Sequence, residues 1–153
     1  PRLVRASAVR LLERFPGRAQ EALLAASRDA DSLVRRHALH ALAADRGAAV
    51  DARLREALDD PSRAVRVNAA RVILRRWTRA RESPGLLAAA LPVLEEDVRE
   101  IPDDPTRWFL LGAARGLAGD DRGALAAYER VVGLDPTARA VREHVLRLRA
   151  RLR

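Results

Sequence analysis

The sequence predicts an all-helical protein built from repeated pairs of helices, and two observations lead to this fold class. The first is composition: of 153 residues, 48% are hydrophobic but only 3% are aromatic, and alanine, leucine and arginine, all good helix formers, predominate. The second is a short apolar pattern with helical spacing that recurs along the chain at a nearly constant interval. Both favour helices packed on helices.

The composition also excludes several classes of function. The 29 basic residues outnumber the 21 acidic ones, which gives a net charge of +8, and every basic residue is arginine. Because cysteine is absent, these residues cannot form a disulfide, a thiolate metal site, a cysteine nucleophile or a haem-attachment motif. No apolar run approaches the roughly 20 residues that a membrane helix needs. We therefore predict neither a cofactor nor membrane insertion.

The chain enters an amphipathic helical pattern at once, from Pro1 to Leu12, with no initiator methionine and no signal segment ahead of it. We expect it to be part of a longer polypeptide or complex. Its compartment stays open between the cytoplasm and, for an exported chain, the periplasm.

Three segments in the first half of the sequence align without gaps. Each begins with a Val-Arg pair, followed three positions later by alanine and three further on by an apolar residue, and the pairs are 30 and 31 residues apart. Since these apolar positions share one face of a helix, each segment predicts a helix that packs closely on its neighbour through the small alanine. The pairs are Val4 and Arg5, Val34 and Arg35, and Val65 and Arg66.

Second helices are predicted between the aligned segments, at residues 18–28 and 48–58, where apolar residues recur with helical spacing. The residues Asp31-Ser32 and Asp60-Pro61-Ser62 supply the capping oxygens and the first-turn proline that are typical of a helix start.

This period and pattern resemble the short HEAT-like repeats of the PBS-lyase type, over residues 1–80, in copies at about 1–30, 31–60 and 61–80. The resemblance implies that the Val-Arg pairs are structural and that an aspartate before each helix forms a ladder with the arginine. Asp29 or Asp31 would then serve Arg35, and Asp59 or Asp60 would serve Arg66.

The repeat changes after Trp77, where the polar run 78–85 predicts a connection. Beyond it stand Trp108-x-x-Leu111-Gly112, then Ala124-x-x-x-Tyr128, then Pro136. These offsets resemble the tetratricopeptide repeat. The resemblance implies a second region at 81–153, with a half repeat at 86–102, a full repeat at 105–136 and a capping helix at 137–152.

Two positions in this region bear on helix boundaries. Gly119-Asp120-Asp121 predicts the turn of a helical hairpin, and Pro92 lies inside the half repeat, so we expect that helix to start at Leu91 or to bend there. Because a single full repeat is too little to be stable alone, we predict that both regions stack into one right-handed α-solenoid of helical hairpins.

Catalysis by these residues is not predicted. His37 and His40 share a helix face and could begin a metal site with a carboxylate such as Asp45, but a solvent-facing or inter-helix role is favoured. The sequence has no nucleophile elbow and no glycine-rich phosphate loop. Its acidic pairs mostly precede predicted helix starts, where capping accounts for them.

Arginine offers an alternative function, because a positively charged HEAT-like surface could hold nucleic-acid phosphates. The charge is spread along the chain, however, and Arg5, Arg35 and Arg66 recur at one motif position. Two candidate anion-binding patches remain. They are Arg75, Arg76, Arg79 and Arg81, and Arg147, Arg149, Arg151 and Arg153.

The tetratricopeptide resemblance also implies a concave groove, which would be lined by Thr106, Phe109, Ala113 and Leu117. Its apolar character favours an apolar peptide segment or a neighbouring subunit. We therefore predict a non-catalytic scaffold for protein–protein interaction, with a nucleic-acid-binding HEAT-repeat protein as the alternative. The order of the two regions also resembles the C-terminal scaffold of exported bacterial multihaem c-type cytochromes, which leaves that role open too.

Overall fold

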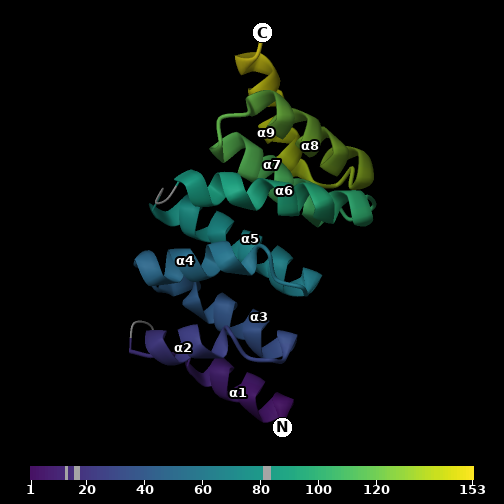
Figure 1. Ribbon diagram of the computed structural model, residues 1–153. Coiled ribbons are helices and arrows are strands. Elements are labelled where there is room, and N and C mark those ends of the chain that lie inside the picture. Colours follow the sequence, from purple (N-terminus) through teal and green to yellow (C-terminus); the bar gives the residue numbers. More distant parts are fainter. Residues whose placement is uncertain (13, 16–17, 81–83) are drawn as a thin grey trace. The chain divides into compact units, whose positions relative to one another are not determined.

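The computed structural model describes residues 1–12, 14–15, 18–80 and 84–153, and within these ranges all regular structure is helical (Figure 1). This confirms the predicted all-α class. The helices are α1 (Arg2–Leu12), α2 (Gln20–Ala26), α3 (Ser32–Ala41), the 3₁₀ helix η1 (Leu42–Ala44), α4 (Ala48–Ala57), α5 (Arg63–Ala80), α6 (Pro84–Glu100), α7 (Pro105–Leu117), α8 (Asp121–Leu134) and α9 (Arg139–Arg151).

The chain divides into two compact units, Pro1–Ala90 and Leu91–Arg153, so the division falls within α6. The sequence placed the boundary earlier, after residue 80. The helix α6 continues through Pro92 from Pro84 to Glu100, and the expectation that it starts at Leu91 was wrong. A proline in a helix interior removes one main-chain hydrogen bond, which a long helix can tolerate when its other residues hold it in place.

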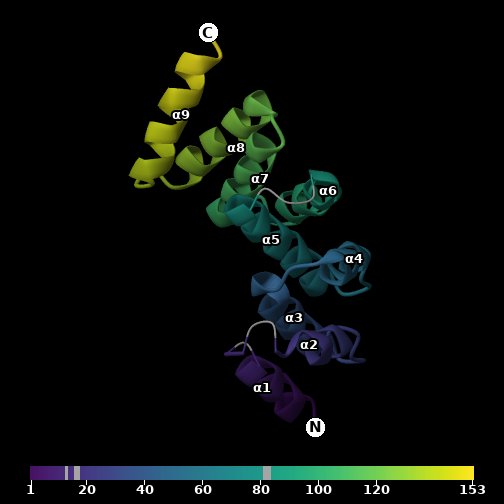
Figure 2. The same cartoon turned by 90° about the vertical axis from the view of Figure 1, so that its left-hand side faces the viewer.

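Unit 1 is a two-layered stack. The first helices of each pair, α1, α3 and α5, pack in succession, while α2 packs against α3 and α4 against α5. Figure 2 shows α2 and α4 along the same side of this row. Helical spacing explains the layering, because each first helix presents one apolar stripe to the helix before it and another to the helix after it.

The aligned segments form the centre of this stack in the second and third copies. Val34, Val65 and the alanines Ala38 and Ala69 are almost completely buried there. The first copy differs, since Val4 is exposed. Among the described residues, α1 has a neighbour on only one side, so one of its two apolar stripes has nothing to pack against.

Ion pairs tie each loop to the helix of the preceding pair. The carboxylate of Asp60 accepts hydrogen bonds from Nε and Nη2 of Arg35, both at 2.8 Å, and the carboxylate of Asp29 accepts from the same atoms of Arg5, at 2.8 and 3.0 Å. Such two-pronged contacts are the strongest geometry available to arginine and carboxylate. The pairing therefore links successive hairpins.

Main-chain carbonyls complete the ladder. Nη1 of Arg35 donates to the carbonyls of Asp29 and Ala30, each at 2.9 Å, and Nη1 of Arg66 donates to the carbonyl of Asp60 at 3.0 Å. The predicted carboxylate partner of Arg35, Asp29 or Asp31, was thus wrong, since Arg35 contacts the carboxylate of Asp60. An aspartate serves the arginine of its own segment through its main-chain oxygen and the arginine of the preceding segment through its side chain.

Further arginines of unit 1 are also structural. Arg53 is buried and donates from Nε to Oγ of Ser27 at 2.8 Å. Arg76 donates to the carbonyl of Asp45 at 2.6 Å and to Oδ1 of Asp51 at 2.7 Å. These side chains connect helices within unit 1, which explains why they are shielded from solvent.

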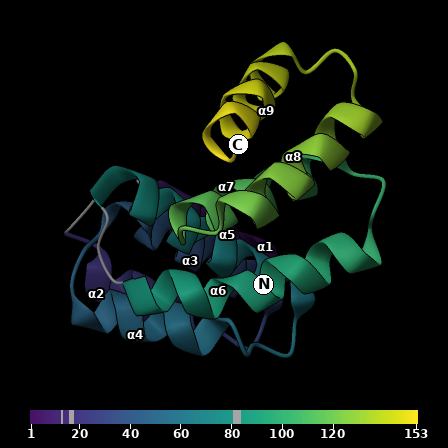
Figure 3. The ribbon, with the colours of Figure 1, turned by 90° about the horizontal axis from the view of Figure 1, so that it is seen from above.

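Unit 2 centres on the hairpin of α7 and α8, with α9 lying alongside α8 (Figure 3). The predicted turn is confirmed: Gly119 has a φ of +87°, and the N–H of Asp120 donates to the carbonyl of Arg115 at 2.9 Å. This arrangement ends a helix when glycine takes a left-handed conformation. Asp120 then caps α8 by accepting from the Gly123 N–H.

Side chains of α6 hold α7 within unit 2. The carboxylate of Asp97, almost fully buried, pairs with Arg107, and Oε1 of Glu95 accepts from Nη2 of Arg115 at 2.8 Å. Near the start of α7, Nε1 of Trp108 donates to the Pro102 carbonyl at 2.7 Å. Polar contacts as well as apolar packing therefore set the position of α7.

Arginines at the same motif position should contribute to the free energy of unfolding in proportion to how deeply their ion pairs are buried. The side chains of Arg35 and Asp60 are 13% and 7% exposed, whereas Arg5 is 49% exposed. We expect Arg35→Ala to lower the free energy of unfolding by about 2–3 kcal/mol because it leaves a buried carboxylate without its partner. Arg5→Ala should lower it clearly less, because water screens an exposed ion pair. Chemical denaturation measures both, and equal losses would contradict the ladder.

The ladder should also weaken in acid. Burial alone would raise the pKa of the Asp60 carboxyl, but hydrogen bonds from Arg35 and the Ser62 N–H outweigh it and hold the pKa below its usual value. A carboxyl whose pKa is lower when folded stabilises the protein above its unfolded pKa, near 4, and that stability is lost as the pH falls further. We therefore expect the free energy of unfolding to fall from pH 5 to pH 2.

Asp60→Asn should make this decline shallower, since it removes a carboxyl with a lowered pKa. The matched control is Asp59→Asn, at the exposed residue next to it. An unchanged pH dependence in Asp60→Asn, measured by urea unfolding at each pH, would argue against a role for the Asp60 carboxylate in folding.

Candidate functional site

A small groove opens between α7 and α9, entirely within unit 2. It has a volume of about 220 Å³. It is lined by Phe109, Tyr128, Ala140, Val141, His144 and Arg147. Most of this lining is apolar or aromatic, and Arg147 contributes the guanidinium.

Aromatic contacts shape the groove. The ring centroids of Phe109 and Tyr128 are 5.8 Å apart and tilted by 54°, and those of Tyr128 and His144 are 4.9 Å apart and nearly perpendicular. Burial raises the pKa of the Tyr128 hydroxyl. Phe109, by contrast, is 44% exposed. The groove thus has a fixed aromatic floor and an accessible apolar edge.

A close approach of two helices fixes the Tyr128 floor. A Cβ added at Gly112 would lie 2.9 Å from two carbons of the Tyr128 ring, so only glycine leaves room for it. Ala124, Val145 and Leu148 pack with the same ring in one buried cluster. Helix α9 therefore turns Val145 and Leu148 inward and its next face, with His144, toward the groove.

The predicted groove residues Thr106, Phe109, Ala113 and Leu117 do share one face of α7, at helical spacing. Only Phe109 is among the residues that line the groove. Thr106 is exposed, and Ala113 and Leu117 are partly buried.

The residues of α9 that line the groove were not anticipated, since the helix 137–152 was interpreted as a polar cap. A signal for them exists in the sequence. Ala140, His144 and Arg147 recur at spacings of four and three, which places them on one face of a helix. That face carries the groove, while the other carries the core.

The four arginines of the predicted C-terminal patch, at residues 147–153, make different contacts. Arg149 donates to Oε1 of Glu129 at 2.8 Å, and Arg151 to Oδ1 of Asp121 at 2.6 Å. Arg147 lines the groove, and Arg153 is exposed at the end of the chain. These four residues therefore do not present one common anion-binding surface.

The other predicted patch is divided as well. Arg75 is exposed, but Arg76 is engaged with Asp45 and Asp51 inside unit 1. Arg81 and the side chain of Arg79 lie outside the described residues. An anion could thus reach Arg75 but would compete with a carboxylate for Arg76.

Within the described ranges, no group of three or more histidine, aspartate or glutamate side chains is placed to hold a metal ion. None of the described helices is long and apolar enough to cross a membrane. His37 and His40 both lie on α3, where His37 is partly buried and His40 is exposed.

Comparison of the chain with protein-family models, with curated proteins and with solved structures finds no match. The groove and the surfaces of the two units are therefore the basis for inferring function.

Glycines on the two helices of the hairpin should respond oppositely to substitution. Gly112→Ala drives a Cβ into Tyr128, so we expect a loss of about 1–3 kcal/mol in the free energy of unfolding. Gly133→Ala, in α8, meets no atom within 4 Å and should stabilise the protein by about 0.5 kcal/mol. Denaturant unfolding compares them, and a neutral Gly112→Ala would show that the Tyr128 ring is free to move.

Proposed function

We propose that this chain is a non-catalytic helical scaffold that binds a partner protein, and that the groove between α7 and α9 accepts an extended segment of that partner. In this proposal the hairpins of unit 1 are HEAT-like repeats and the hairpin of α7 and α8 is a tetratricopeptide-like repeat, as their sequence motifs suggest. Stacked hairpins of this kind serve as binding surfaces rather than as catalysts.

The observation that carries the proposal is the accessible Phe109 beside a preformed aromatic floor. Pockets for drug-sized ligands span about 300–1,000 Å³. A groove of about 220 Å³ is smaller and suits a single apolar side chain of a peptide. Aromatic anchors in such pockets supply much of the binding energy at protein interfaces.

The groove also favours one kind of peptide. Arg147 is exposed beside the apolar wall of Phe109 and Val141. A guanidinium next to an apolar pocket pairs with a carboxylate that lies close to the buried anchor. We infer that the preferred segment carries an aliphatic or aromatic residue next to an aspartate or glutamate.

The nucleic-acid alternative receives less support from the same side chains. Arg76, Arg149 and Arg151 all contact carboxylates of this chain, so their charge is partly neutralised before any partner binds. Phosphate binding would have to displace those contacts.

Selection of random twelve-residue peptides on phage, against the whole chain, tests the proposal. We expect the enriched peptides to share an apolar residue beside an acidic one. Their affinity should fall at least about tenfold with Phe109→Ser, which removes the apolar edge, and several-fold with Arg147→Ala. Fluorescence anisotropy of one labelled peptide measures both changes.

Leu146→Ser is the matched control, since Leu146 is also a large exposed apolar residue of α9 but does not line the groove. It should leave the affinity unchanged. Selected peptides that bind Phe109→Ser as tightly as the parent chain would refute the groove. Tight binding of duplex DNA that weakens steeply with salt would instead support the nucleic-acid alternative.

A further inference from the structure

The first and second helices of the pairs in unit 1 differ in charge. The first helices, α1, α3 and α5, contain three, two and six arginines, respectively, and no aspartate or glutamate. The second helices, α2 and α4, do carry carboxylates, at Glu21, Asp51 and Glu56. The row of first helices is therefore a region of positive charge in which no helical residue supplies a negative one.

One set of aligned positions lies on the solvent side of this row. Arg10, His40 and Arg71 each stand six residues after the valine of their Val-Arg pair. Arg71 precedes Arg76 by five residues, which places it about 140° round α5 from the side that contacts Asp51 of α4. Figure 2 shows α2 and α4 along one side of the row, so this set of residues lies away from them.

Two more arginines extend this set along the helices. Arg36 stands four residues before His40 on α3, and Arg75 stands four residues after Arg71 on α5. Residues with this spacing share one face of a helix. All of these side chains are exposed except that of Arg71, which is partly buried. The basic face, as we call it, consists of Arg10, Arg36, His40, Arg71 and Arg75.

The arginines of the basic face differ from others of unit 1 in their contacts. Arg5, Arg35 and Arg76 each form an ion pair with an aspartate. Within the part of the chain that the structure describes, no side chain of the basic face pairs with a carboxylate, and Nε of Arg71 is shielded from solvent without a hydrogen-bond acceptor. Because a partly desolvated guanidinium without an acceptor is unfavourable, an anion that binds beside it gains a strong interaction.

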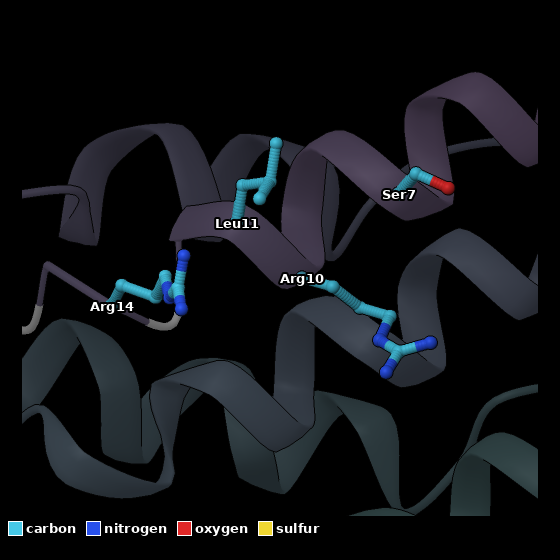
Figure 4. Close-up of a pocket in the computed structure, with 4 residues that line it drawn as sticks. All are labelled: Ser7, Arg10, Leu11 and Arg14. Atoms are coloured by element: carbon cyan, nitrogen blue, oxygen red, sulfur yellow. The ribbon is translucent and has the colours of Figure 1, made fainter.

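Space for a partner is present at the α1 end of the basic face. Ser7, Arg10, Leu11 and Arg14 line a concavity of about 580 Å³ (Figure 4). Figure 4 shows the guanidinium groups of Arg10 and Arg14 pointing away from one another. A single phosphate would therefore not bridge them, and Arg10 is left to contact a separate group of a partner.

Charge density indicates which polyanion matches the basic face. Packed helices lie about 8–10 Å apart, so the face extends about 20 Å across α1, α3 and α5 and presents four arginines. Duplex nucleic acid carries about twelve phosphates over that length, far more than four guanidinium groups can neutralise. A helix of that length has about 13 residues, and one carboxylate per turn gives it about four on one side. The numbers thus favour an acidic helix.

We infer that the basic face binds an acidic helix of a partner protein, which lies across α1, α3 and α5 with one row of carboxylates toward the arginines. This inference shares with the proposed function only the premise that the partner is a protein, and it does not depend on the groove of unit 2. Because salt screens attraction between exposed charges, binding is strongest at low ionic strength.

A synthetic acidic helix tests the inference. The probe is a fluorescein-labelled peptide of four Glu-Ala-Ala-Ala repeats, which carries one row of carboxylates, and its neutral counterpart has glutamine in place of every glutamate. At low salt, fluorescence anisotropy should show that the whole chain binds the acidic peptide and not the neutral one. Binding of neither peptide, or equal binding of both, would contradict the inference.

The test variant removes three charges of the basic face, through Arg10→Gln, Arg36→Gln and Arg75→Gln. All three side chains are exposed, so the variant should fold as the parent chain does. We expect its affinity for the acidic peptide to fall about tenfold, since each exposed ion pair contributes up to a few-fold.

The matched control makes the same change in net charge outside the basic face, through Arg18→Gln, Arg55→Gln and Arg122→Gln. These side chains are also exposed. The affinity of this variant should fall by less than about twofold, because screening weakens the effect of distant charges. Equal losses in the two triple variants would show that only net charge matters, and the inference would be overturned.

Two further measurements distinguish other sites and other partners. Phe109→Ser, in the groove of unit 2, should leave the affinity for the acidic peptide unchanged, and a loss would place the peptide in the groove instead. Duplex DNA of sixteen base pairs should bind less tightly than the peptide. If it binds more tightly, and the test variant weakens it, the basic face is a nucleic-acid interface. Either result overturns the inference.

Discussion

The pairing of arginine with loop aspartates is the interaction on which unit 1 depends. Each loop that joins two hairpins presents main-chain carbonyls and a carboxylate as hydrogen-bond acceptors. The arginine of the preceding segment donates to the carboxylate, and the arginine of the following segment donates to the carbonyls. The single side chain of Arg35 donates two hydrogen bonds to the carboxylate of Asp60. It also donates to the main-chain carbonyls of Asp29 and Ala30. Because arginine presents donors in a rigid planar fork, one side chain can hold two successive loops at once, which lysine could not do.

Because arginines are used in this way, the net charge overstates how much positive charge a partner can reach. A charge of +8 on a lysine-free chain suggests an anionic partner when composition alone is considered. In the folded protein, several arginines bind carboxylates or carbonyls of the chain itself, among them Arg53, which is buried against Ser27. The charge that remains available to a partner is local, and it includes Arg147 at the groove, Arg75 on α5 and Arg10 on α1.

The sequence predicted what depends on local physics. Helical spacing located the helices, and Gly119 marked a turn that only a left-handed residue completes. It could not predict which arginine each aspartate carboxylate meets, because both neighbours of Asp60 in the ladder, Arg35 and Arg66, are consistent with the same spacing. Nor did it reveal the groove, whose lining joins Phe109 to residues of α9 that only the packing of α9 on α8 brings close.

The groove of unit 2 and the outer face of α1, which carries Val4 and Leu11, are both exposed apolar surfaces, but they differ in origin. A helix in a stack of hairpins carries apolar residues on two sides, and each side is buried only where a neighbour exists. Leu11 and Val72 occupy aligned positions, yet one is open and the other buried, because α5 has α3 and α4 on that side. Phe109 is half exposed for a different reason, since α9 lies far enough from α7 to leave a cavity. The groove therefore suits a single side chain, whereas the open face of α1 corresponds to a face that two helices cover in the later copies.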